Sequence, residues 1–118
     1  MTSDAPRIVR EAISLADVRS LAEAGFGDMV KASVDVARGL LAIGGELHSD
    51  EEALLLDDGS KQSDIWGINI YPEEPGDGWI EFDSMINVRP GQGNRSRSVD
   101  DAAIQLTIRR IVDALIRR

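Results

Sequence analysis

The strongest constraint on the fold is the stretch of residues 79–98, because its two halves follow different patterns. Residues 79–89 alternate between apolar and polar positions, which is the period of a β-strand with two unlike faces. Residues 90–98 are polar and contain glycine, arginine and serine, which is typical of a loop. The stretch therefore predicts a strand over residues 79–89 followed by a loop that leads into the last helix.

Further strands are predicted wherever the same alternation recurs. Residues 29–37, 40–47 and 65–71 alternate and are rich in β-branched side chains. Arg38 and Gly39 are predicted to form the tight turn between the first two of these strands, and residues 72–78 a hairpin loop. A short strand over residues 7–13 is predicted as a fifth member. The sheet is therefore expected to be antiparallel, with four to five strands.

Three helices are predicted, over residues 15–24, over residues 50–57 and after residue 98. Each start matches a capping box, a serine with an acidic residue three positions later: Ser14 with Asp17, Ser49 with Glu52, and Ser98 with Asp101. The last helix carries an apolar stripe at positions 104, 108, 111, 112 and 115. The expected fold is α+β, with the helices packed on one face of the sheet, in a single domain of residues 1–118 whose first six residues are frayed.

Charge and composition limit the functional classes. The chain has 118 residues, no cysteine and a net charge of −8, which argues against a nucleic-acid partner. No apolar run is long enough to cross a membrane, and the N-terminus has no secretory signal, so a cytoplasmic protein is expected. Residues 46–83 carry twelve acidic residues against one lysine, whereas residues 89–118 carry seven arginines against three aspartates. This asymmetry indicates either solubility or the pairing of two copies.

Several segments resemble an uncharacterised family of small prokaryotic proteins, catalogued as a domain of unknown function. The segments that carry the resemblance are FGDMVK (26–31), GGELH (44–48), DGSKQ (58–62), WGIN (66–69), and NVRP (87–90) with GNRS (93–96). The resemblance covers most of the chain and implies a prokaryotic, cytoplasmic, single-domain protein. It implies no reaction, cofactor or partner.

The polar side of the predicted sheet is one candidate site. If the apolar sides of all strands face the helices, the other side displays carboxylates, amides, one imidazole and basic groups. They are Lys31, Ser33, Asp35, Glu46, His48, Asn69, Tyr71, Glu81, Asp83, Asn87 and Arg89. Two interpretations remain open: an ordinary solvated sheet face and a ligand-binding face.

His48, the only histidine, is a second candidate. With Glu46 and Asp50, and also with Glu51 and Glu52, it could ligate a divalent metal ion, and its intrinsic pKa suits a general base. The spacing matches no known metal motif, and no cofactor is indicated. The alternative is a surface histidine beside an acidic helix start. We expect His48 to be accessible to solvent.

The loop of residues 90–98 is the best candidate for binding an anion. Its glycines leave backbone N–H groups accessible, Arg95 and Arg97 supply forked donors, and a helix start follows. The alternative is an ordinary capped connection. In addition, Trp79 is predicted to lie opposite Trp66 and to be exposed, as at an interface.

Two functional hypotheses follow. The first is a binding or assembly module, such as a homo-oligomer, that holds a small anionic ligand or a protein partner. Its predicted ligand-binding residues are Arg89, Asn94, Arg95, Arg97, Asp35, Asn69, Asp83 and Asn87. The second is a small enzyme, with or without a metal ion, centred on His48 and nearby carboxylates.

Overall fold

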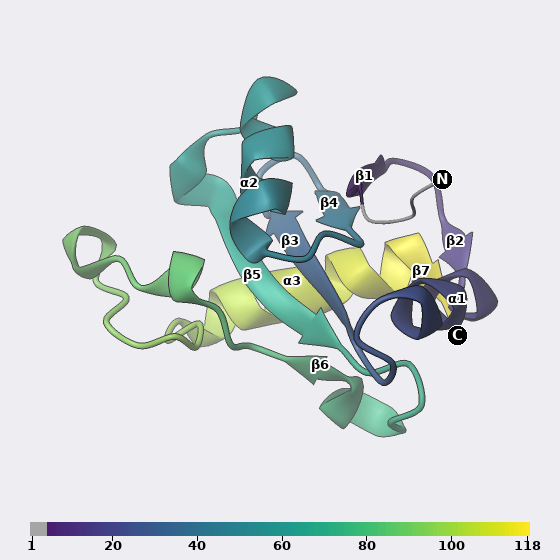
Figure 1. Cartoon of the computed structure of the whole chain (residues 1–118). Helices are drawn as coiled ribbons and strands as arrows, with labels where there is room; N and C mark the ends of the chain where they lie inside the picture. Colours follow the sequence, from purple (N-terminus) through teal and green to yellow (C-terminus); the bar gives the residue numbers. More distant parts are fainter. Residues whose placement is uncertain (1–4) are drawn as a thin grey trace.

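A five-stranded antiparallel sheet forms the centre of the fold, and helices lie on both of its faces (Figure 1). The computed structural model describes residues 5–118, so most of the predicted frayed leader lies outside the described residues. The strand order is β1 (Arg7–Val9), β4 (Leu40–Ile43), β3 (Val30–Asp35), β5 (Ile65–Ile70) and β6 (Ile80–Glu81). The predicted α+β class and antiparallel sheet are confirmed.

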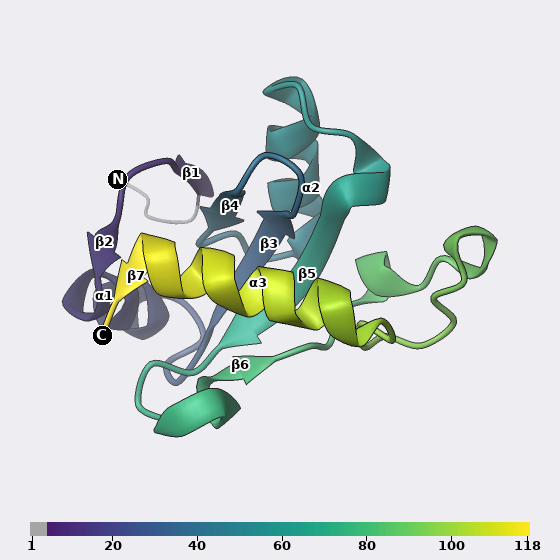
Figure 2. The ribbon, with the colours of Figure 1, turned by 180° about the vertical axis from the view of Figure 1, so that it is seen from behind.

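Helix α3 (Ala102–Leu115) covers the apolar face of the sheet (Figure 2). Its buried side chains are Ile108, Val112 and Leu115, which lie on the predicted stripe and pack in one cluster with the strands. From β3 this cluster takes the residues at even positions, 30, 32 and 34. The N-cap of α3 is Asp101, whose side chain accepts from two backbone N–H groups, so the predicted cap at Ser98 is wrong.

Helix α2 (His48–Asp57) covers the opposite face, where β3 presents its odd positions. Leu55 of α2 packs against Ala42 of β4 and Ile65 of β5 in a second, smaller cluster. The expectation that the helices share one face is therefore correct for α3 and wrong for α2. The predicted polar side of the sheet is not a solvated surface, because α2 and its polar side chains bury much of it.

Helix α1 (Leu15–Ala24) begins at the predicted capping box, in which Ser14 and Asp17 exchange side-chain and backbone hydrogen bonds. Just before it, β2 (Ile13–Ser14) pairs in parallel with β7 (Ile116–Arg117). The predicted strand at residues 7–13 is thus split between β1 and β2. Within residues 5–118, no helix has the length and apolar character needed to cross a membrane.

The predicted strand at 79–89 is the largest error. Only Ile80 and Glu81 form a strand, and two short 3-10 turns follow, Met85–Asn87 and Pro90–Gln92. Asn87 explains the change, because its side chain accepts from the backbone N–H of Gly67 at 2.8 Å and donates to the Gly67 carbonyl at 3.0 Å. One side-chain amide thus takes the place of a continued strand beside β5. Trp79 is 1% exposed and shares the main core with Trp66, so its predicted exposure is wrong.

The connection from β4 to α2 also differs from the prediction. The strand ends at Ile43 because Gly44 adopts a φ of 94°, which favours glycine and breaks the extended backbone. Helix α2 begins at His48, with Leu47 as an N-cap that makes no side-chain hydrogen bond. Ser49 lies inside the helix, so the predicted capping box of Ser49 with Glu52 is wrong.

Candidate functional site

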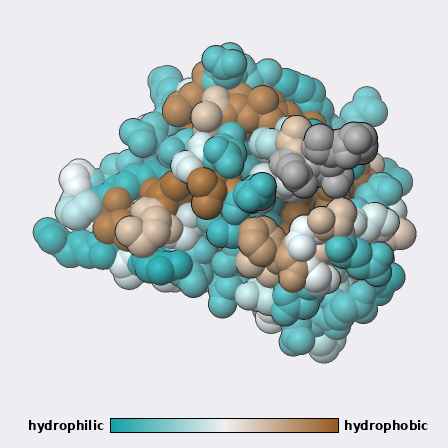
Figure 3. Space-filling model, viewed as in Figure 1, coloured by the Kyte–Doolittle hydropathy of each residue, from teal (hydrophilic) through white to brown (hydrophobic). Residues whose placement is uncertain are grey.

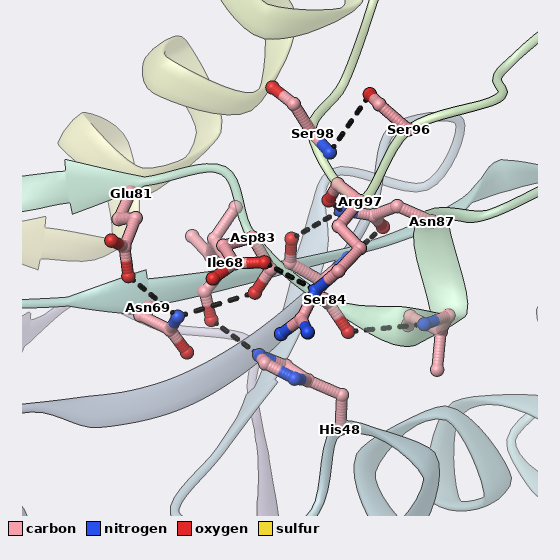
Figure 4. A network of polar contacts seen from close by, with 12 residues as sticks. His48, Ile68, Asn69, Glu81, Asp83, Ser84, Asn87, Ser96, Arg97 and Ser98 are labelled. Carbon is pink, nitrogen blue, oxygen red and sulfur yellow. Dashed lines mark hydrogen bonds and ion pairs between the residues drawn. The ribbon is translucent and has the colours of Figure 1, made fainter.

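A pocket of about 190 Å³ opens where the start of α2 meets the edge of β5 and the segment that follows β6. Polar side chains reach it from five separate parts of the chain, and Figure 4 shows His48, Asn69, Asp83, Ser84 and Arg97 together. Its lining residues are Lys31, Leu47, His48, Ser49, Asn69, Asp83, Ser84, Met85, Ile86 and Arg97. Three of the predicted ligand-binding residues, Asn69, Asp83 and Arg97, therefore meet here, together with His48.

Gly67 allows the pocket to form. A Cβ atom on this strand residue would lie 2.6 Å from the Cβ and Oγ atoms of Ser84 and 3.1 Å from Cδ2 of His48. Without that atom, the segment after β6 and the first turn of α2 both close onto β5. A glycine inside a strand pattern signals such a close approach. Gly67, in the predicted strand 65–71, therefore carried a signal for this packing in the sequence.

His48 is buried, with 7% of its surface exposed, so its predicted accessibility is wrong. Its Nε2 atom lies 2.8 Å from the carbonyl oxygen of Ile68. Because a carbonyl only accepts, Nε2 carries the proton in this contact. Burial lowers the pKa of His48, the positive charges of Lys31 and Arg97 lower it further, and the Ile68 carbonyl and Asp83 oppose this. The imidazole is therefore neutral near pH 7.

Arg97 provides the most accessible positive charge of the pocket. Its Nε atom donates to Oδ1 of Asp83 at 2.7 Å, and the two side chains are 57% and 41% exposed. Figure 4 shows the guanidinium between Asp83 and the His48 ring. Within residues 5–118, its two terminal nitrogens make no hydrogen bond. Arg97 thus offers donors to the pocket even while it is paired with Asp83.

Asn69 lies on the wall of the pocket, in β5. Its Nδ2 atom donates to Oε1 of Glu81 at 2.9 Å and to the backbone oxygen of Asp83 at 3.2 Å. Those two acceptors fix the orientation of the amide, because the flipped form would turn an oxygen toward both of them. The Oδ1 atom is buried and has no hydrogen-bond partner within the described residues.

The pocket combines positive charge with an apolar rim. Lys31 and Arg97 face one carboxylate, Asp83, and the neutral His48, so the pocket has a local charge of +1 in a chain of −8. The backbone N–H groups at the start of α2 add to this positive potential. Leu47 and Met85 are 55% and 66% exposed and line the same opening. On this face of the molecule, hydrophobic residues gather in separate groups between hydrophilic ones (Figure 3).

Glu51, suggested from the sequence only as one of several metal ligands beside His48, lies behind the pocket. Its carboxyl group is fully buried, with Oε1 3.1 Å from Oγ of Ser33 and Oε2 accepting from the backbone N–H of Gly45 at 3.0 Å. Burial raises the pKa of Glu51 to about 8, against the opposing effect of these two hydrogen bonds. The sequence carried no signal for the burial of Glu51, because an acidic residue in a first helical turn is usually exposed.

Several other predicted site residues have structural contacts instead. Arg89 stacks on the Trp66 ring at 4.5 Å and donates to the backbone oxygens of Gln62, Ile65 and Ile86. Asn94 is buried and bonds three carbonyl groups of its own loop and neighbouring segment. These side chains, with Asn87, hold residues 82–101 in shape, and none of them lines the pocket.

The remaining candidates also lie away from the pocket. Asp35 is buried, and its Oδ1 atom accepts from the backbone N–H groups of Ala37 and Arg38 in the hairpin turn. Arg95 is exposed and makes no side-chain hydrogen bond within residues 5–118. Glu46 and Asp50 are exposed, and across the described chain no three His, Asp or Glu side chains gather as a metal site would require. The suggested metal site of Glu46, His48 and Asp50 is therefore not formed.

Comparison with known proteins identifies one family. A family model described as "Protein of unknown function (DUF5674)" matches residues 7–115. This match confirms the resemblance to an uncharacterised family. No curated protein and no solved structure matches the chain.

Proposed function

The chain belongs to the DUF5674 family, which supplies no activity to transfer, and on the geometry of its pocket we propose that it is a binding module for a small anion. The anion occupies the pocket at the start of α2. Arg97 and Lys31 supply the charge, and backbone N–H groups of α2 supply further donors.

The observation that carries this proposal is the contrast between Arg97 and three other arginines of the chain. Arg89, Arg109 and Arg118 each lie over an aromatic ring and donate to backbone carbonyls. Arg97 instead directs its guanidinium toward the pocket (Figure 4). Lys31 also lines this pocket, with its Nζ atom 5.3 Å from the centroid of the Phe26 ring. Two like charges beside a buried imidazole repel each other, and an anion removes that repulsion. Hydrogen bonds to charged groups contribute about 1.5–3 kcal/mol each.

The enzyme hypothesis retains one supporting observation. His48 is neutral at the pocket wall, and a neutral imidazole is the form that acts as a general base. Its Nε2 atom is engaged with Ile68, so only Nδ1 could accept a proton from a substrate. Turnover of a bound compound that is lost in His48→Asn, with binding retained, would favour catalysis over binding alone.

The anion proposal is tested by titrating the protein with inorganic phosphate and following the ring protons of His48 by NMR. The chain has one histidine, so these signals need no assignment. We expect phosphate to shift them and to raise the pKa of His48, because a nearby negative charge favours the imidazolium.

The matched variants are Arg97→Ala and Arg95→Ala. Both remove one arginine from the same loop, but only Arg97 lines the pocket. Phosphate binding should be weakened at least about tenfold in Arg97→Ala and little changed in Arg95→Ala. Equal effects of the two substitutions would mean that phosphate binds only through general loop charge, and the proposal would be wrong.

We further propose that the protein is prokaryotic and cytoplasmic and that two copies associate through the acidic segment 46–83 and the basic segment 89–118. The opposite charges of these segments support the association. Mass measured in solution at about 0.05 M and 1 M salt tests it, because screening weakens exposed charge pairs. A monomer at low salt would rule it out.

A further inference from the structure

We infer that the bound anion belongs to a hydroxylated compound, whose hydroxyl group donates to Oδ1 of Asn69 while its anionic group meets Arg97 and Lys31. This inference rests on the proposed function and names its ligand class. It covers hydroxy acids and phosphate monoesters of polyols, which share this chemistry.

Asn69 has a buried acceptor that no other group within residues 5–118 satisfies. The residue is only 7% exposed, and its Oδ1 atom is buried without a partner in the described chain. Buried polar atoms in folded proteins nearly always have a partner, and an orphaned acceptor costs about 1–3 kcal/mol. The Nδ2 atom is already engaged by Glu81 and Asp83, so the amide cannot relieve the cost by flipping. A donor from a ligand satisfies it.

The Oδ1 acceptor of Asn69 lies beside one of the two basic residues of the pocket. Asn69 of β5 is paired in register with Lys31 of β3, and both line the pocket. Neighbouring strands lie about 5 Å apart, so the acceptor and the lysine stem stand side by side on one face of the sheet. A compound with an anionic group and a donor on neighbouring atoms can therefore reach both at once.

The charges that line the pocket favour a hydroxyl over an ammonium group as the donor. Lys31 and Arg97 outnumber Asp83, and their charges already depress the pKa of His48. A further cation would meet the same repulsion, whereas a hydroxyl carries no charge. The ligand is therefore an anion with a neutral donor.

The size and walls of the pocket fit a small compound. Its volume of about 190 Å³ corresponds to roughly six water-sized groups, taking about 30 Å³ for each. The apolar side chains of Leu47, Met85 and Ile86 form the part of the wall that a short carbon skeleton would contact. A nucleotide or a folded protein segment would not enter it.

The experiment uses matched ligands that differ by hydroxyl groups, titrated into the full chain and followed by NMR. The pairs are lactate with propionate and glycerol 3-phosphate with propyl phosphate, and inorganic phosphate serves as the reference anion. In the wild type we expect the hydroxylated member of at least one pair to bind about five- to tenfold more tightly. The pair that discriminates identifies the carboxylate or the phosphate class.

The variant Asn69→Ala tests whether Asn69 causes the preference for the hydroxylated ligand. It should abolish the discrimination within a pair, whereas Arg97→Ala should weaken both members of the pair together. Discrimination that persists in Asn69→Ala would overturn the role of this residue. If Asn69→Ala fails to fold, the wild-type pairs still decide the ligand class.

The two proposals fail in different ways. Equal binding of the members of both pairs would overturn the hydroxyl inference and leave the anion site intact. No binding of any of the five compounds would overturn the anion site and the inference together.

Discussion

The two faces of the sheet are built on different principles. The face under α3 presents valine, isoleucine and alanine, and the buried stripe of α3 covers it with more apolar side chains. The face under α2 presents Ser33, Asp35 and Asn69, all buried, and α2 covers it with His48 and Glu51. The α3 face can gain stability from nearly every contact, whereas the α2 face must match each polar atom to a partner.

The difference assigns separate roles to the two faces. Full burial of one large aliphatic side chain contributes about 1.5–3 kcal/mol, so the α3 face supplies most of the stability. A satisfied buried polar group contributes much less, and an unsatisfied one is a cost. On the α2 face, Asp35 and Asn69 each keep one buried oxygen without a partner within residues 5–118. Such groups contribute little to stability, but they can recognise a ligand.

The largest effect is expected on the α3 face. Ile108→Asp would bury a carboxylate where Ile108 is 0% exposed, and the loss, on the order of 5 kcal/mol, should abolish cooperative folding. Leu106→Asp, two residues earlier on the same helix, is the control, because Leu106 is 49% exposed. Thermal unfolding followed by circular dichroism compares them. Cooperative unfolding of Ile108→Asp at an unchanged midpoint would show that α3 is not the cover of this face.

Glu51 provides the next largest effect, and it depends on pH. The folded pKa is about 8, above the ordinary value of 4.5, so the folded state holds a proton that the unfolded state has released. Stability should therefore fall as pH rises from about 5 to 8, by on the order of 3 kcal/mol. In Glu51→Gln this decline should be absent.

Asp50→Asn is the control, since Asp50 lies next to Glu51 on α2 but is exposed. Urea unfolding at several pH values measures both variants against the wild type. His48 acts in the opposite direction below pH 6.5, because its lowered pKa makes the folded state lose stability as the imidazole is protonated. An identical pH profile in wild type and Glu51→Gln would exclude a buried, protonated Glu51.

Gly67→Ala tests the close packing of the α2 face. The new Cβ atom would meet Ser84 at 2.6 Å, and we expect a loss of about 1–3 kcal/mol together with a displaced pocket. Gly91→Ala is the matched control, because nothing lies within 4 Å of its Cβ position and its backbone needs no positive φ. Chemical unfolding measures the loss, and phosphate titration measures the pocket. Equal stabilities of the two variants would show that Ser84 does not close onto β5.

Asp83→Asn should have the smallest effect on stability. It tests whether the α2 face binds an anion through Arg97. The Arg97–Asp83 pair is largely exposed, so its loss should cost less than about 1 kcal/mol. The substitution raises the local charge of the pocket from +1 to +2, and phosphate should bind severalfold more tightly. Asp113→Asn, an exposed carboxylate on α3, makes the same change in net charge elsewhere. Weaker phosphate binding in Asp83→Asn than in Asp113→Asn would mean that Asp83 does not compete for Arg97.

The sequence correctly predicted the helices and strands whose signals lie within a few consecutive residues. β3, β5 and α1 follow from alternation and from the capping box of Ser14, because these signals lie within the element itself. The strand at 79–89 was wrong because its end is decided by Asn87, which bonds a glycine twenty positions away. The polar second face was predicted but its burial under α2 was not, because buried serine and aspartate look like surface residues until their partners on α2 are known.

The sequence predicted several residues of the candidate site, but it did not predict where in the fold they meet. Asn69, Asp83 and His48 were selected on the polar face of the predicted sheet and Arg97 in the loop of residues 90–98, and all four line one pocket. Lys31 was assigned only to the sheet face, and Gly67 was assigned no role. Arg89 and Asn94 looked equally suitable, but Trp66 and the loop carbonyls engage them. Such competition for donors depends on tertiary contacts and leaves no local pattern.

The parallel pairing of β2 with β7 has a consequence for how the chain folds during synthesis. Ile13 pairs with Ile116, so this pair joins segments from nearly opposite ends of the sequence. A chain that emerges from the ribosome N-terminus first would present β3, β4 and β5 long before α3 and β7 appear. The apolar face of the sheet therefore stays uncovered until residues 102–117 have left the exit tunnel, and folding is expected to complete only late in translation.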